Sequence, residues 1–169
     1  MSFEINIISV AQDKPSVYQG NSTVLLRNEA MCEDVKRYYK IWPVFSNVQG
    51  MLYNVVTEVD PGFYSAFPLC DSDFTGKRSG EVSVYIPNEV SQNLTPLIIK
   101  NKFINDVESI IDLLIDSSPV KTILFHSRYQ DGDFEVIQGT LRRNDFLRML
   151  RQHELMFNVC YAVTKDSLH

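Results

Sequence analysis

The sequence has no continuous run of the roughly 20 apolar residues that a transmembrane helix needs. Its apolar start covers only residues 3–10, and Glu4 stands where a secretion signal would need basic residues. We therefore expect residues 3–10 to form a strand, and we expect a cytoplasmic protein that makes no contact with a membrane.

Cysteines are few and are not arranged in motifs. Cys32, Cys70 and Cys160 lie far apart, and the CxxC spacing of zinc sites and redox motifs is missing. We expect reduced thiols, with Cys160 a small residue of the core. The motifs GxGxxG, GxxxxGK[ST], HExxH and GxSxG are also missing, and no two histidines stand at ligand spacing. The sequence thus predicts no metal and no cofactor.

Positive charge is not in excess, because 16 Lys and Arg residues stand against 21 Asp and Glu residues, a formal net charge of −5 at pH 7. Proteins that hold nucleic acids by general electrostatics need clustered positive charge. One basic segment, residues 142–151, carries four arginines. These arginines have three possible roles: contact with phosphate or RNA, ion pairs with the acidic helix described below, or a solvated helix face. Since it lacks interleaved exposed aromatic residues, we predict no nucleic-acid partner.

At 169 residues the chain is long enough for a sizeable core, and we expect residues 1–169 to form a single domain. Hydrophobic periodicity predicts strands at 3–10, 51–59, 81–87, 120–129, 134–141 and 156–163, and helices at 28–39, 101–116 and 145–152. Clustered strands joined by tight turns, such as Asp60-Pro61-Gly62, favour an α+β fold. We expect a mostly antiparallel sheet with one long amphipathic helix, residues 101–116, and shorter helices. A doubly wound fold is the alternative, but the sequence has no Gly-rich strand-to-helix loop that would support it.

The dipeptide Asp131-Gly132 stands between two β-rich segments and is a strong signal for a two-residue hairpin turn. Such a turn sets the register of the flanking strands and places two pairs opposite each other: Tyr129 with Phe134, and Arg128 with Glu135. An aromatic pair and an oppositely charged pair are typical of sheet stabilisation. This segment is therefore interpreted first as scaffold.

His126 lies two residues before Arg128 and carries the alternative that the protein is a small enzyme. Catalysis would use His126 with Arg128 or a nearby carboxylate. The hairpin register instead places His126 beside apolar residues, without a second group to orient it. The sequence favours a structural histidine, and we assign no catalytic residue.

Three carboxylates recur at intervals of four residues along the expected helix 101–116. Glu108, Asp112 and Asp116 stack like charges beside its apolar face, which disfavours an isolated helix by roughly a few tenths of a kcal/mol per pair. One interpretation is a solvated face that basic residues from elsewhere compensate. The other is an anionic patch that meets a cationic protein. On the second interpretation the partner-binding residues are Glu108, Asp112, Asp116 and the turn acids Asp131 and Asp133.

Aromatic residues gather in two poorly periodic segments beside prolines, residues 37–45 and 62–68. They are Tyr38, Tyr39, Trp42, Phe45, Phe63, Tyr64 and Phe67. Use in the core explains most of them. Anchors of a protein interface show the same pattern, so this alternative stays open.

The segment 112–163 resembles small bacterial immunity proteins of polymorphic-toxin and contact-dependent growth inhibition systems. The similar parts are the acidic amphipathic helix, the HSRYQDGDFEVIQG segment and the ending NDFLRMLRQHELMFNVCYAV. The resemblance implies a non-enzymatic cytoplasmic protein that binds a cognate toxin domain, frequently a basic nuclease, and blocks its active site or an exosite. The alternatives are the small enzyme using His126 and an adaptor subunit of a larger assembly.

Overall fold

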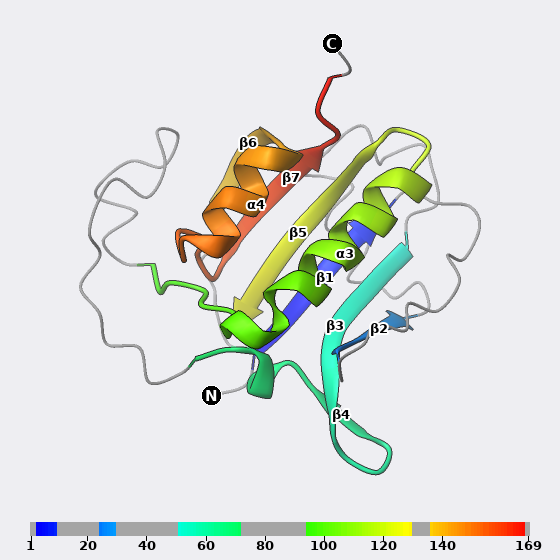
Figure 1. Cartoon of the computed structure of the whole chain (residues 1–169), viewed down its shortest axis with the longest axis vertical. Coiled ribbons are helices and arrows are strands. Elements are labelled where there is room, and N and C mark those ends of the chain that lie inside the picture. The colour runs from blue at the N-terminus through cyan, green and yellow to red at the C-terminus, as the bar shows by residue number, and fades with distance from the viewer. Residues whose placement is uncertain (1–2, 10–23, 30–50, 72–93, 130–135, 168–169) are drawn as a thin grey trace.

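The computed structural model describes residues 3–9, 24–29, 51–71, 94–129 and 136–167. They form an α+β fold in which two helices lie on one face of a mixed, mostly antiparallel sheet (Figure 1), which confirms the expected fold class. The elements are β1 (Phe3–Ser9), β2 (Val24–Glu29), β3 (Met51–Asp60), β4 (Phe63–Ser65), the 3-10 helix η2 (Phe67–Leu69), α3 (Asn101–Ser117), β5 (Thr122–Tyr129), β6 (Val136–Arg142), α4 (Arg143–Arg151) and β7 (Val159–Thr164). None of the helices in these ranges is long and apolar enough to cross a membrane.

The strand order is β2-β3-β1-β5-β7-β6, and β4 pairs with β3. Every neighbouring pair of the described strands is antiparallel except β6 and β7, which are parallel. The sequence explains why β7 takes an inner place. Its residues 159–163 are all buried, and a strand with apolar side chains on both sides avoids water only when both faces of the sheet are covered.

The predicted hairpin between β5 and β6 is wrong, because β7 lies between these two strands. Ile137 pairs with Cys160 of β7 and does not lie beside His126. Arg128 faces Glu4 of β1 across the ladder. The turn residues 130–135, with Asp131, Asp133, Phe134 and Glu135, lie outside the described residues. The turn signal predicted that β5 and β6 pair with each other, whereas both pair with β7.

The connection β6-α4-β7 is a crossover between parallel strands, which requires a helix or a long segment and cannot be a tight turn. Helix α4 starts two residues before the expected 145–152 and presents Phe146, Leu147, Met149 and Leu150 to the core. The Phe146 ring meets the rings of Phe125 and Tyr161 edge-on, with centroids 5.1 and 5.8 Å away. This aromatic cluster holds α4 against the centre of the sheet.

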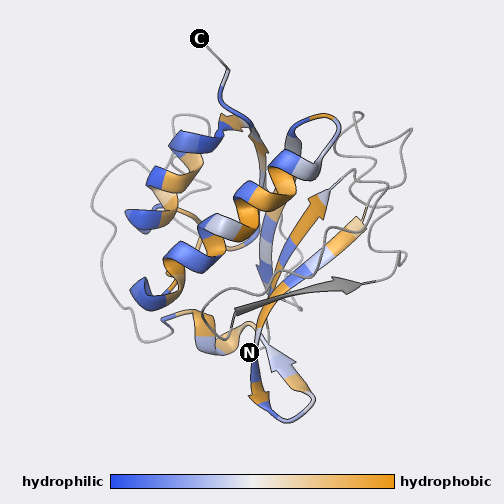
Figure 2. Cartoon of the chain, turned by 45° about the vertical axis from the view of Figure 1, so that its right-hand side comes forward, coloured by the Kyte–Doolittle hydropathy of each residue, from blue (hydrophilic) through white to orange (hydrophobic). Residues whose placement is uncertain are grey.

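Helix α3 lies where the apolar stripe predicts a helix. Its buried residues recur at helical spacing, and Val107, Ile110, Ile111 and Leu114 are completely covered. Figure 2 shows the apolar sides of α3 and α4 turned toward the sheet and their polar sides turned away. The core fills the space between these helices and the facing side of the sheet.

The other expected elements fare differently. Strand 51–59 corresponds to β3 and the last strand, 156–163, to β7, which begins three residues later. The helix expected from Asn28 is wrong at its start, since Asn28 and Glu29 belong to β2. The rest of that helix, residues 30–39, and the expected strand 81–87 lie outside the described residues.

The turn between β3 and β4 follows the Asp60-Pro61-Gly62 signal. Gly62 has a φ of +79°, which L-residues with a side chain rarely adopt, and its N–H donates to Glu58 Oε1 at 2.9 Å. The hairpin continues beyond the sheet and projects from the bottom of the molecule in Figure 1.

We expect Gly62→Ala to lower the free energy of unfolding by about 1 kcal/mol, because the methyl group disfavours a positive φ. An added Cβ would meet no atom within 4 Å, so backbone strain is the whole effect. Urea unfolding measures it, with Gly62→Asn as the control because asparagine tolerates this conformation. Equal stability of the Ala variant and the natural chain would contradict the turn.

Candidate protein-binding surface

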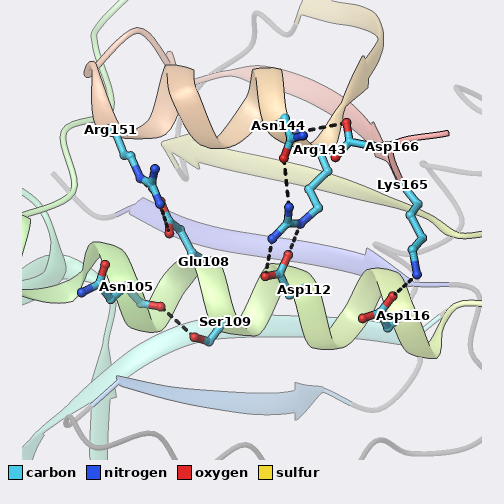
Figure 3. A network of polar contacts seen from close by, with 10 residues as sticks. All are labelled: Asn105, Glu108, Ser109, Asp112, Asp116, Arg143, Asn144, Arg151, Lys165 and Asp166. Carbon is cyan, nitrogen blue, oxygen red and sulfur yellow. Dashed lines mark hydrogen bonds and ion pairs between the residues drawn. The ribbon is translucent and has the colours of Figure 1, made fainter. Parts of the chain in front are cut away.

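The α3 acids Glu108, Asp112 and Asp116 each form an ion pair inside the chain (Figure 3). Glu108 accepts from Arg151 through two hydrogen bonds, Nε to Oε1 at 2.5 Å and Nη2 to Oε2 at 2.7 Å. Asp112 holds Arg143 in the same two-pronged manner, with Nη2 2.6 Å from Oδ2. Asp116 accepts from Lys165 Nζ at 2.8 Å. We call these contacts the α3 ion-pair row.

The row runs from α3 to α4 and the chain that follows β7. The hydrogen bonds raise the pKa of Arg143 and that of Arg151, and the Lys165 ammonium lowers the pKa of the Asp116 carboxyl. Only 12% of the Glu108 side chain is exposed, whereas its partner Arg151 is 61% exposed. The Glu108 carboxylate of this pair is therefore largely covered, whereas the Arg151 side chain is largely in solvent.

The α3 ion-pair row agrees with the interpretation in which basic residues from elsewhere in the chain compensate the negative charge of the helix. The compensating groups are mostly arginines of the basic segment 142–151, so two unusual sequence features explain each other. The assignment of Glu108, Asp112 and Asp116 to partner binding stays a prediction, but in this structure their carboxylates are already engaged. Asp131 and Asp133 lie outside the described residues.

His126 lies on the face of the sheet opposite the two helices, since its neighbours in the chain, Phe125 and Ser127, point the other way. Its partners across the ladder are Asn6 of β1 and Cys160 of β7. The three are 1%, 3% and 2% exposed. Asn6 also joins Asn54, whose Nδ2 donates to Asn6 Oδ1 at 2.6 Å.

The sequence did not indicate that a histidine, an asparagine and a cysteine meet there, because they come from strands far apart in the chain. Such groups can perform nucleophilic chemistry where a substrate reaches them. Here all three are buried, and they form a row across the sheet on its face opposite the helices.

Cys70 is a free, buried thiol beside Ile99. Burial raises its pKa to about 12, although Lys100 acts in the opposite direction. The thiol is therefore protonated at neutral pH and is a poor nucleophile. No group of metal-binding side chains occurs among the residues that the structure describes.

Large apolar side chains are exposed on the β3–β4 hairpin and the turn that follows it. Phe63 is 60% exposed, Phe67 is 53% exposed and Val59 is 47% exposed. The whole stretch from Glu58 to Phe63 is open to solvent. We call residues 58–63 the hairpin tip.

Of the two aromatic segments, 62–68 thus supplies exposed rings, as the interface interpretation expects, and 37–45 lies outside the described residues. The position of Phe63, directly after the turn, was the signal in the sequence that this ring is exposed. A residue directly after a two-residue turn has few neighbours when the hairpin extends past its sheet.

The hairpin tip is also acidic. Glu58 and Asp60 flank Val59, and no Lys or Arg occurs between Lys40 and Lys77 in the sequence. The hairpin tip thus exposes two apolar side chains, Phe63 and Val59, together with two carboxylates. No family model, curated protein or solved structure matches the chain.

Proposed function

We propose that this protein is an immunity protein, which binds a cognate bacterial toxin domain in the cytoplasm and neutralises it by covering its active site or an exosite. The toxin domain is cationic, as a basic nuclease is. The protein acts by binding and performs no catalytic step.

The exposed hairpin tip is the observation that carries the proposal. An exposed Phe costs free energy in water, and burial against a partner recovers about 25 cal/mol per Å² of apolar surface. Aromatic anchors of this kind supply much of the binding free energy at protein interfaces. A protrusion with Phe63 and Val59 exposed is therefore expected of a protein that binds another protein.

Two further features support a binding protein over an enzyme. The α3 ion-pair row engages its acids and bases with one another, so they are not free to transfer protons. His126, on which the enzyme alternative depends, is buried between Asn6 and Cys160. The net charge of −5 favours a cationic partner.

The test uses the reading frame that lies directly upstream of this gene, where the gene of a cognate toxin is expected. Its C-terminal domain is expressed in bacteria with and without the present chain. We expect growth arrest by that domain alone, rescue when this chain is co-expressed, and copurification of the two proteins. Rescue without copurification, or copurification of a non-toxic assembly, would overturn the proposal, and the latter would favour an adaptor subunit.

A further inference from the structure

We infer that the hairpin tip, residues 58–63, is the part of the protein that enters the partner, and that the partner presents a concave, cationic surface to it. This inference rests on the proposed function and adds to it the contact surface and the chemistry of the surface it fits. Shape, charge and rigidity each support it.

The shape favours a concave partner. Beyond its pairing with β2 and β1, strand β3 continues as a two-stranded projection in which β4 is its one partner among the described strands (Figures 1 and 2). A flat partner would touch only the end of such a projection. A cleft can cover both sides of it, and so can bury Phe63 together with Val59.

The charge favours a cationic partner. Glu58 and Asp60 lie at the projecting end, and neither forms an ion pair with a basic residue of the described chain. Lys100 donates its N–H to Leu69 in the segment that follows the hairpin. The Lys102 ammonium lies 4.7 Å from the ring centre of Phe103. Within the part of the chain that the structure describes, no ion pair neutralises the negative charge of the tip.

A rigid hairpin loses less conformational entropy when it binds a partner. Pro61 restricts the turn, and the Gly62 N–H is held by Glu58. At the base, the Asp71 N–H donates to Ile98 at 2.9 Å, and the Phe67 ring lies 5.9 Å from that of Phe3. The turn and the segment that follows β4 are thus held by hydrogen bonds and a ring contact, which restrict the conformations of the hairpin.

The competing surface is the helix face that carries Glu108, Asp112 and Asp116. A partner that approached it would have to separate carboxylates from Arg151, Arg143 and Lys165 before it gained new contacts. The acids of the hairpin tip require no such exchange with a basic residue of the described chain. Charge complementarity therefore assigns the partner to the tip.

The experiment measures binding of the full chain to the purified C-terminal domain of the upstream reading frame's product, by titration calorimetry and stopped-flow mixing. We expect Phe63→Ala to weaken binding by about ten-fold or more, as truncation of an aromatic anchor does. We expect Asp60→Asn to slow association by about two-fold at low salt and to have no effect at high salt. Heparin, a polyanion, should displace the chain from the cationic surface.

The controls remove matched groups elsewhere. Val120→Ala truncates an apolar residue that is 37% exposed, and Asp145→Asn removes one exposed charge from α4. Both should bind like the natural chain. If the tip variants also bind like the natural chain, the inference is overturned and the proposed function stands.

Three other outcomes would also overturn the inference. If the natural chain does not bind the toxin domain at all, the proposed function fails and the inference fails with it. If Phe63→Ala abolishes self-association in sedimentation and leaves toxin binding unchanged, the tip binds a second copy of this chain. Failure of heparin to compete would contradict the cationic surface.

Discussion

Glu108→Lys should destabilise the protein by about 2 kcal/mol, a large effect for a residue at the edge of a helix. The carboxylate is nearly covered and is held by two hydrogen bonds from Arg151. A lysine there would place an ammonium beside the Arg151 guanidinium at a position where only 12% of the natural side chain is exposed. Urea or thermal unfolding followed by circular dichroism measures the loss.

This expectation reverses the one that the sequence alone supports. If Glu108 belonged only to a binding surface, charge reversal would slow association and leave stability unchanged. The double variant Glu108→Lys with Arg151→Glu separates the two cases, since it exchanges the charges and keeps the pair. We expect it to regain most of the lost stability, and no recovery would contradict the ion pair.

Phe146→Ala should have the largest effect, about 3–5 kcal/mol of unfolding free energy. Phe146 is completely buried and its ring packs edge-on against Phe125 and Tyr161. Its removal leaves a cavity between α4 and the sheet. The crossover helix between β6 and β7 then loses its ring contacts with Phe125 and Tyr161. The midpoint of thermal unfolding should fall by roughly 10 °C.

Phe63→Ala is the matched control, since it deletes the same atoms from an exposed position. We expect it to change stability by less than about 1 kcal/mol, because surface substitutions rarely do more. Similar losses for the two variants would show that Phe63 is part of the core. The pair of variants also separates folding from binding, because only the Phe63 variant should fold normally and bind poorly.

Local patterns predicted those parts of the fold that depend on neighbouring residues. The apolar stripe between Phe103 and Ile115 predicts α3, and Asp60-Pro61-Gly62 predicts the turn after β3. Both depend on the conformational preferences of residues that are close together in the sequence. The pairing of β5 with β7 depends instead on residues 32 to 42 positions further on, and a turn signal at Asp131-Gly132 carries no information about them.

The candidate site shows the same limit. The acids of α3 and the arginines of α4 were both visible in the sequence, and their complementary charge was the available signal for the pairing. Their spacing differs, since Glu108 and Asp112 are one helical turn apart while Arg151 and Arg143 are two turns apart. Long arginine side chains bridge that difference, which a periodic pattern does not reveal. The exposure of Phe63 likewise depends on how far the hairpin extends past the sheet.

The inner position of β7 has a consequence for how the protein is made. β7 is the last strand of the chain, yet it joins β5 to β6. While the ribosome is still adding residues 159–164, one edge of β5 and one edge of β6 have no strand to pair with, and α4 has no complete sheet beneath it. The native sheet therefore forms completely only after residues 159–164 have been added. A chain that ends before Val159 keeps both open edges and is prone to pair with other chains.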